Sequence, residues 1–185
     1  MDTKKQIVRL ALELIREKGF LSIGYDDLAQ QLGITRAAIH YHFEKKEDLG
    51  IAVTQMMIQD LIDLDTYVSS TRLTIEEKLD HFLIKQIEPF SEKQICSISS
   101  LQSDVESLPD SVKEKLQEVT KLELKVLVNI ISEFKIDDVT ADTEYIEELA
   151  ATILSAVKGA LLYRRVIGDS SLYPKVIKQI KRLLL

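Results

Sequence analysis

Apolar residues recur at three- and four-residue intervals along most of the chain, a spacing typical of amphipathic α-helices. The first stripe contains Ile7, Leu10, Ala11, Leu14 and Ile15, and Gly19 ends it. Comparable patterns predict further helices at about 25–32, 36–42, 46–64, 74–88, 95–107, 110–134, 143–167 and 171–185. The sequence thus predicts an all-α fold of about nine helices and no convincing strand.

Glycine and proline divide the chain into two regions. Four of the six glycines lie in the first 50 residues, whereas all three prolines lie in the rest. Thr74 and Glu77 have the spacing of a capping box, and Pro174 suits the first turn of the last helix. We therefore expect short helices with tight turns first, followed by long helices.

Composition narrows the classes of protein. The chain has 185 residues, a net charge of −6 and a single cysteine, Cys96, so an intrachain disulfide is excluded. Its apolar runs are too short for a membrane-spanning helix, and the start MDTKKQIVRL lacks the apolar core of a signal peptide. These features predict a cytoplasmic globular protein with no membrane partner.

The strongest local pattern is Ala29-x3-Gly33-x5-Ile39. A helix-turn-helix needs a small residue where its helices touch, a glycine with positive φ in the turn, and an apolar residue facing inward from the second helix. Thr35 suits the N-cap of that second helix. The remaining residues of this small core are Leu28, Leu32, Ile34 and Phe43. The spacing favours DNA binding, with an ordinary helical hairpin as the alternative.

The segment from Ile7 to Leu49 resembles the N-terminal domain of the TetR family of bacterial transcriptional repressors. The resemblance rests on ALELIREKGF at 11–20, DDLAQQLGIT at 26–35 and AAIHYHFEKKEDL at 37–49. It implies a helix-turn-helix DNA-binding domain at residues 1–46 and a helical effector-binding and dimerisation domain at 47–185. The later helices resemble the family only in number and length.

Two positions depart from the family pattern. Gly24 occupies the place of a Ser or Thr that usually caps the second helix; it caps more weakly, but its N–H remains available to a phosphate. His40 stands near the end of the recognition helix, where the family usually has Tyr, and Tyr41 and His42 follow it. Neither change threatens the fold.

The candidate DNA contacts follow from the placement of a recognition helix in the major groove. Thr35, Arg36 and Ala38 are the expected base readers, and Arg36 suits bidentate pairing with a guanine. The small Ala37 allows close approach to the DNA. The expected contacts to phosphates come from Gly24, Tyr25, His40, Tyr41 and Lys46. His42 is expected to pack between helices instead.

No constellation of residues indicates an enzyme. The sequence has no Gly-rich phosphate loop, no HExxH and no nucleophile elbow. His40 and His42, two residues apart on a helix, point in nearly opposite directions and are poor co-ligands for a metal. Cys96 fits a buried structural thiol, with a redox sensor as the alternative. We expect no catalytic residue, no metal and no cofactor.

The last two expected helices are rich in apolar residues, and the first of them also carries small ones such as Ala156 and Gly159. Two such helices per chain can form a four-helix bundle with their symmetry mates, and the resemblance implies the same arrangement. This predicts a homodimer through residues of about 143–185, with a role in the monomer core as the alternative.

The resemblance also implies an effector pocket among the middle helices, at about residues 74–165. The candidate lining residues are Phe82, Gln86, Phe90, Gln102, Asn129, Tyr145 and Tyr163. Because aliphatic residues predominate there, a small apolar or amphipathic effector is favoured.

The sequence therefore predicts a ligand-responsive DNA-binding regulator, a repressor released from a palindromic operator when its effector binds. The alternatives are a DNA-binding protein without an effector, and a helical binding protein or enzyme with a vestigial helix-turn-helix. Residues 1–49 carry eight basic and eight acidic residues, so the net charge of −6 falls on residues 50–185. A neutral DNA-binding segment predicts a modest dependence of DNA affinity on salt.

Overall fold

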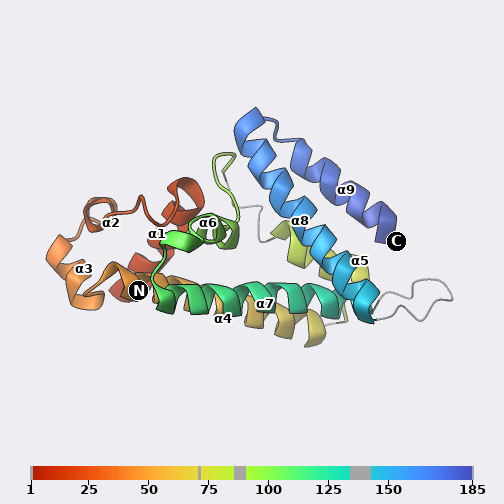
Figure 1. The fold of residues 1–185 in the computed structure, drawn as a ribbon, viewed down its shortest axis with the longest axis horizontal. Coiled ribbons are helices and arrows are strands. Elements are labelled where there is room, and N and C mark those ends of the chain that lie inside the picture. Colours follow the sequence, from red (N-terminus) through yellow and green to blue (C-terminus); the bar gives the residue numbers. More distant parts are fainter. Residues whose placement is uncertain (1, 71, 86–90, 134–142, 185) are drawn as a thin grey trace. The chain divides into compact units, whose positions relative to one another are not determined.

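The computed structural model describes residues 2–70, 72–85, 91–133 and 143–184. These described residues form nine α-helices, one π-helical segment and one 3₁₀ turn, and no strand (Figure 1). The predicted all-α fold is thereby confirmed. The chain divides into two compact units, Met1–Gln59 with Cys96–Thr120 and Asp60–Ile95 with Lys121–Leu185.

The first unit contains three short helices that share one core. They are α1 (Thr3–Lys18), α2 (Tyr25–Leu32) and α3 (Arg36–His42). Asp2 caps α1 by accepting a hydrogen bond from the Lys4 N–H, and Gly19 ends the helix with φ at 83°. The buried side chains at the meeting of these helices are Ile7, Ala11, Ile15, Leu28, Ile39 and Phe43. Most of the core predicted from the apolar stripe of α1 and from the helix-turn-helix pattern is thus confirmed, whereas Leu10, Leu32 and Ile34 are only half-buried.

Residues far along the chain complete this first unit. It contains α6 (Ser97–Ser103), the 3₁₀ turn η2 (Val105–Ser107) and the first turns of α7 (Asp110–Ser132). The Ser100 hydroxyl donates to the Ile15 carbonyl oxygen at 2.7 Å, which ties α6 to the end of α1. The Ser111 hydroxyl donates to the Glu47 carboxylate and ties α7 to the first turn of α4 (Lys46–Ser70).

The helix expected at 95–107 is interrupted in the structure. Helix α6 ends at Ser103, and Asp104 leaves the helical conformation with φ at −95° and ψ at 4° before η2 begins. Aspartate favours such helix ends because its side chain competes for backbone hydrogen bonds. The prediction of one continuous helix was therefore wrong at this point.

The second unit begins with a capped helix that changes its winding. The Thr74 hydroxyl accepts from the Glu77 N–H at 3.2 Å, and the Glu77 carboxylate accepts from the Thr74 N–H at 2.8 Å, so the predicted capping box is confirmed. Helix α5 (Ile75–Asp80) then passes into the π-helix η1 (His81–Lys85) instead of continuing as an α-helix. A hydrogen bond from the Tyr173 hydroxyl to the Leu83 carbonyl accompanies this change, and no local pattern encodes such a bond.

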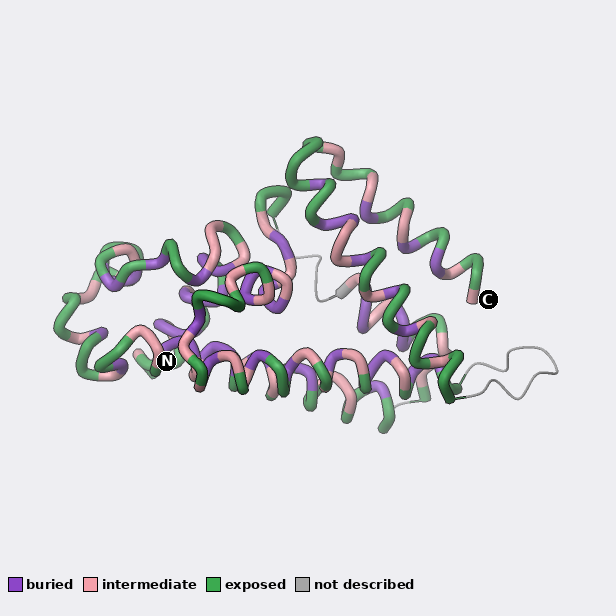
Figure 2. Tube along the Cα trace, in the orientation of Figure 1, coloured by how far each residue is buried: buried purple, intermediate pink, exposed green. Residues whose placement is uncertain are grey.

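Helices α8 (Thr143–Ile167) and α9 (Leu172–Leu184) lie side by side in the second unit (Figure 1). Gly168 ends α8 with φ at 74°, and Pro174 lies in the first turn of α9, the position predicted for it. The buried positions follow one side of each helix (Figure 2). None of the described helices is long and apolar enough to cross a membrane.

Candidate DNA-binding surface

The turn between α2 and α3 has the geometry of a helix-turn-helix. Gly33 adopts the left-handed conformation, with φ at 65° and ψ at 30°, and the Ile34 N–H donates back to the Ala29 carbonyl at 3.1 Å. The Thr35 hydroxyl accepts from the Ala38 N–H at 3.1 Å and so caps α3, while Ile39 is completely buried. The structural roles predicted for Ala29, Gly33 and Ile39, and the N-cap role of Thr35, are confirmed.

One face of α3 is open to solvent. Arg36, Ala37, His40 and Tyr41 are all exposed, and their spacing places them together on the side opposite Ile39. Tyr41 is 85% exposed, and its ring meets the half-buried His42 edge to face at 5.2 Å. Thr35 is exposed at the start of this face, and Ala38 is half-buried at its edge. Most of the predicted DNA contacts on α3 therefore share one accessible surface.

Arg36 is held by neighbours within the domain. Its Nη1 lies 3.0 Å from an Asp26 carboxylate oxygen, and its Nε–H donates to His40 Nε2 at 3.5 Å. His40 Nδ1 lies 3.3 Å from the Glu44 carbonyl oxygen. Both ring nitrogens of His40 therefore face polar groups of the same domain. The sequence analysis did not single out Asp26, although an acid in the first turn of α2 was the available signal.

The backbone N–H of Gly24 is not free in the structure. It donates to the Asp27 carboxylate at 2.9 Å, and Lys18 Nζ lies 2.9 Å from the same oxygen. The Gly24 N–H and then the Lys18 ammonium hold the pKa of Asp27 below its ordinary value. In this structure the Gly24 N–H is thus engaged by Asp27, and its contact to a phosphate stays a prediction.

Tyr25 is a packing residue rather than an open phosphate contact. Its hydroxyl donates to the Phe43 carbonyl at 2.9 Å, and its ring meets His40 edge to face at 4.7 Å. Burial, with the Asp48 carboxylate as a further cause, raises the pKa of Tyr25 to about 12. In this conformation the hydroxyl proton of Tyr25 is donated inside the domain, and the phosphate contact expected of this residue stays a prediction.

Lys46 also points into the domain. Its ammonium donates to the Leu21 carbonyl at 2.9 Å and lies 5.0 Å from the centre of the Phe20 ring. Burial lowers the pKa of Lys46, although the Asp104 and Asp27 carboxylates act in the opposite direction. In this conformation the Lys46 ammonium holds the loop before α2 instead of projecting toward a phosphate, as was expected.

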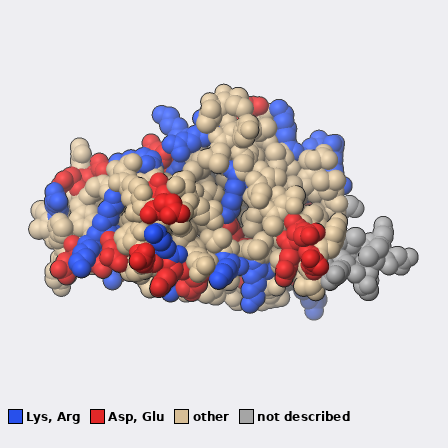
Figure 3. Space-filling model, in the orientation of Figure 1, with Lys and Arg blue, Asp and Glu red and all other residues tan. Residues whose placement is uncertain are grey.

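The face of the molecule drawn in Figure 3 carries mixed charge, with acidic and basic side chains interspersed over it. Among the N-terminal cations, Lys4 lies 5.5 Å from the centre of the Phe43 ring, and Lys5 and Lys45 are exposed. Contacts to DNA must therefore come from a few well-placed groups, consistent with the neutral balance of residues 1–49.

The described effector candidates named from the sequence belong to both units of the chain. Phe82 is buried in the second unit, whereas Gln102 donates to the Thr120 hydroxyl at 3.1 Å within the first unit. Asn129, Tyr145 and Tyr163 are exposed. Gln86 and Phe90 lie outside the described residues. The shared effector pocket expected of these residues therefore stays a prediction.

A groove of about 740 Å³ lies elsewhere, between the π-helix η1 and α9. The side chains that line it are Ile84, Tyr173, Pro174, Ile177, Lys178, Lys181 and Arg182. None of these residues was expected to line a pocket, because they come from segments about ninety residues apart and share no motif. The described residues contain no group of three or more His, Cys, Asp or Glu that could hold a metal ion.

Comparison with known proteins supports the helix-turn-helix and extends beyond it. Residues 7–53 match the family model described as "Bacterial regulatory proteins, tetR family". The chain is 29% identical to a TetR transcriptional regulator from Legionella pneumophila, whose crystal structure matches with a TM-score of 0.90 over 100% of this chain and 98% of that one. A TetR-family regulator from Agrobacterium tumefaciens shares the fold, with a TM-score of 0.84 over 97% and 96% of the two chains at 22% identity.

Two curated relatives are also transcriptional regulators. The biofilm operon icaADBC HTH-type negative transcriptional regulator IcaR of Staphylococcus epidermidis is 28% identical over 116 residues, which cover 63% of this chain and 62% of that protein. The fatty acid metabolism regulator protein of Bacillus subtilis is 24% identical over 129 residues, or 69% and 66% of the two chains. The match spans slightly less than two thirds of each relative's length. These matches are to regulators and not to enzymes, in agreement with the expectation from the sequence.

Proposed function

We propose that this chain, which belongs to the TetR family of bacterial transcriptional regulators, acts as a homodimeric repressor that leaves its operator when a small apolar or amphipathic effector binds. The observation that carries its DNA-binding part is the open face of α3, where Arg36, Ala37, His40 and Tyr41 are exposed while Ile39 is buried. A recognition helix in the major groove presents such a face to base edges and phosphates.

In this proposal the two ends of α3 have different tasks. Thr35, Arg36 and Ala38 read bases, because residues at the start of a recognition helix reach base edges. His40 and Tyr41 contact phosphates farther along the helix. Residues 1–46 are the DNA-binding segment, and residues 47–185 hold the effector and form the dimer. The protein would act in the cytoplasm, where operator DNA is found.

The homodimer is proposed to form through residues of about 143–185. Helix α8 exposes the large apolar side chains Leu162, Tyr163, Val166 and Ile167, and Val166 is 85% exposed. On the same helix Ala151, Ala156 and Gly159 are small and lie at the surface, so another helix can approach closely. Contiguous exposed apolar residues are typical of an interface, and two-fold symmetry matches a palindromic site.

Repression and its release are proposed as a shift between two populations. The support for repression is a relative, IcaR, whose name describes a negative regulator. An effector that binds one dimer arrangement better than the other would move the recognition helices away from the spacing of the two half-sites. By linkage, operator DNA must weaken effector binding by the same factor, typically equivalent to about 1–3 kcal/mol.

The first experiment is genome-wide footprinting with the purified full-length protein, followed by mobility-shift titration of the protected sites at several salt concentrations. We expect a shared palindromic sequence bound far more tightly than random DNA, with a modest salt dependence. Equal affinity for all duplexes would contradict sequence-specific regulation. An effector that binds free and operator-bound protein equally would contradict the release mechanism and leave specific DNA binding intact.

A further inference from the structure

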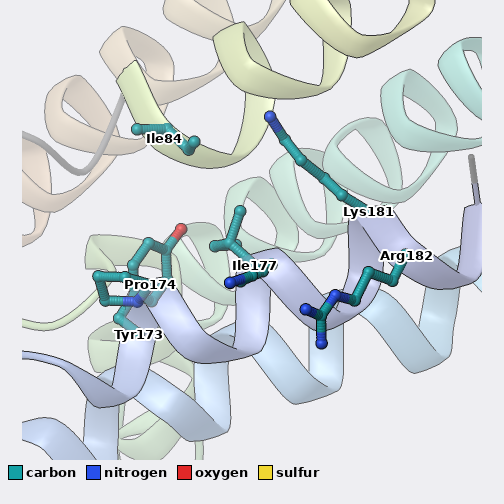
Figure 4. A pocket seen from close by; sticks show the side chains of 7 residues that line it. Ile84, Tyr173, Pro174, Ile177, Lys181 and Arg182 are labelled. Atoms are coloured by element: carbon teal, nitrogen blue, oxygen red, sulfur yellow. The ribbon is translucent and has the colours of Figure 1, made fainter.

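The groove between η1 and α9 has an apolar interior. Ile84 extends from the π-helix and Ile177 from α9 toward the same space, and Tyr173 and Pro174 close one end (Figure 4). The Tyr173 hydroxyl is already engaged, because it donates to the Leu83 carbonyl. What Tyr173 offers to the groove is therefore its ring. The interior suits hydrocarbon rather than a polar molecule.

The other end of the groove is cationic. Lys178, Lys181 and Arg182 line it, and no acidic side chain is among the described lining residues. Helix α9 as a whole carries the basic residues Lys175, Lys178, Lys181 and Arg182 and no acid, although the chain has a net charge of −6. This helix is therefore a basic segment within the acidic part of the chain.

One of these three cations is neutralised within the fold. Lys181 Nζ lies 2.5 Å from an Asp80 carboxylate oxygen and 3.1 Å from a Glu76 oxygen. Burial alone would lower the pKa of Lys181, but these two carboxylates outweigh it and hold the pKa above its ordinary value. Lys181 is thus a fixed, paired charge that ties α9 to α5.

The other two cations remain available. Lys178 and Arg182 are exposed, and neither has an ion-pair partner among the described residues. They are four residues apart on one helix, so their side chains project from the same face. An anion placed between them could accept charge-assisted hydrogen bonds from both.

We propose that this groove binds a free, single-chain fatty carboxylate, with its headgroup at Lys178 and Arg182 and its alkyl chain along Ile84, Ile177 and Pro174. The two cations favour an anionic headgroup, and the apolar interior favours an alkyl chain long enough to fill the groove. From Pro174 to Arg182 the helix rises about 12 Å, which suits an extended alkyl chain of medium length. The carboxylate site itself does not depend on the function proposed above. Only the effect of carboxylate binding on operator affinity rests on that function.

The exposed apolar residues of α8 that are proposed for the dimer are not among those that line the groove. They are Leu162, Tyr163, Val166 and Ile167. A dimer that forms through this stripe of α8 is therefore compatible with occupancy of the groove by the carboxylate.

The test is calorimetric titration of the full-length protein with sodium dodecanoate below its micellar concentration. We expect saturable binding, and clearly weaker binding of the uncharged dodecanol and the cationic dodecyltrimethylammonium. The Lys178→Gln/Arg182→Gln variant should lose about 10- to 100-fold in affinity because two charge-assisted hydrogen bonds are removed. The Lys175→Gln variant is the matched control, because Lys175 lies on the same helix, outside the groove, 3.7 Å from Asp169. It should bind like the wild type.

A second variant tests the apolar end without touching charge. Ile84→Trp should fill the groove and weaken dodecanoate binding, with thermal unfolding used to verify that the variant is folded. Equal binding by the wild type and the Lys178→Gln/Arg182→Gln variant would overturn the proposal, as would equal affinity for dodecanoate and dodecanol. Binding to anionic vesicles but not to monomeric dodecanoate would also overturn it, in favour of a membrane surface.

Operator affinity, measured with and without dodecanoate, separates this site from the proposed function. Dodecanoate binding that needs Lys178 and Arg182 but leaves operator affinity unchanged supports the site and contradicts its effector role. Absence of dodecanoate binding with intact operator binding overturns the site and leaves the DNA-binding function in place.

Discussion

The guanidinium of Arg36 and the carboxylate of Asp26 form an ion pair across the helix-turn-helix, with 3.0 Å between Nη1 and Oδ2. The two side chains are 59% and 77% exposed, so the pair adds only about 0–1 kcal/mol to stability. The Asp26 carboxylate therefore orients the Arg36 guanidinium in the free protein. Breaking this weak ion pair costs little free energy, so Arg36 can leave Asp26 and pair with the edge of a guanine.

Replacing Arg36 by alanine is expected to weaken operator binding by about 1–3 kcal/mol and to relax the preference at one base pair, because a bidentate base contact is lost. Mobility-shift titration against operator variants with single base-pair changes measures both effects. An equal loss on every sequence would show that Arg36 contacts only phosphate.

Asp26→Asn is expected to tighten operator binding while leaving thermal unfolding nearly unchanged. The substitution removes a carboxylate that competes for Arg36 and repels nearby phosphates. The double variant Asp26→Asn/Arg36→Ala separates these two causes. If Asp26→Asn tightens binding equally with and without Arg36, repulsion alone explains the effect and the ion pair does not contribute.

Gly50→Ala is expected to destabilise the first unit by about 1–3 kcal/mol through overpacking. A Cβ atom at Gly50 would lie 2.9 Å from both Phe20 Cζ and Val112 Cγ2, closer than real Cβ contacts allow. Urea unfolding measures the loss. Adding Phe20→Leu shortens one of the two neighbouring side chains and should recover part of the lost stability. If it recovers none, contact with Phe20 is not the cause of the destabilisation.

Glu123 and Lys158 form a buried ion pair of 2.5 Å in the second unit, with side chains 10% and 17% exposed. Lys158→Met should cost about 3–5 kcal/mol at pH 7, because it leaves a carboxylate buried without its partner. The double variant Glu123→Leu/Lys158→Met should be close to the wild type in stability, or above it. Urea unfolding of the three proteins tests this order.

The pH dependence of the same variants gives an independent check. Burial outweighs the Lys158 ammonium and raises the pKa of Glu123 above its ordinary value of 4.5. A raised pKa means that Glu123 binds its proton more tightly in the folded state than in the unfolded state. The stabilisation that results is therefore complete below about pH 4.5 and is lost as the pH rises through the pKa of the folded state. The deficit of Lys158→Met should therefore shrink as the pH falls from 7 toward 4.5. A deficit independent of pH would mean that lost packing, not charge, causes it.

Val166→Asp should convert a dimer into monomers, because it places a charge in the exposed apolar stripe of α8. Val105→Asp is the matched control, since Val105 is also exposed but lies in η2, outside residues 143–185. Analytical ultracentrifugation compares the two variants with the wild type. Identical masses for all three would contradict a dimer interface on this stripe.

Local patterns were enough to predict the helix-turn-helix. Gly33, Thr35 and Ile39 act within a few residues of their partners, so their spacing encodes the turn, the cap and the core contact directly. The capping box at Thr74 and the first-turn position of Pro174 were predictable for the same reason. In each case the deciding interaction lies within one helix or one turn.

Several of the misplaced features depend on contacts between distant segments. The Tyr25 hydroxyl finds its acceptor at Phe43, and Lys46 finds the Leu21 carbonyl, so neither side chain projects as its position on a helix suggested. The π-helix and the groove at Ile84 need α9, about ninety residues later. Periodicity identifies which face of a helix is apolar, but not which distant helix will cover it.

The bonds from Ser100 to Ile15 and from Ser111 to Glu47 have a practical consequence for engineering. A DNA-binding fragment that ends at residue 46 would lose the Ser100 hydroxyl, which donates to the Ile15 carbonyl. It would also expose Phe20, which lies against Gly50 beside Val112. Chimeric regulators made by joining such a fragment to another sensor should fold poorly. A transplant that carries residues 96–120 along with the N-terminal helices keeps these supports, so the portable module is discontinuous in the gene.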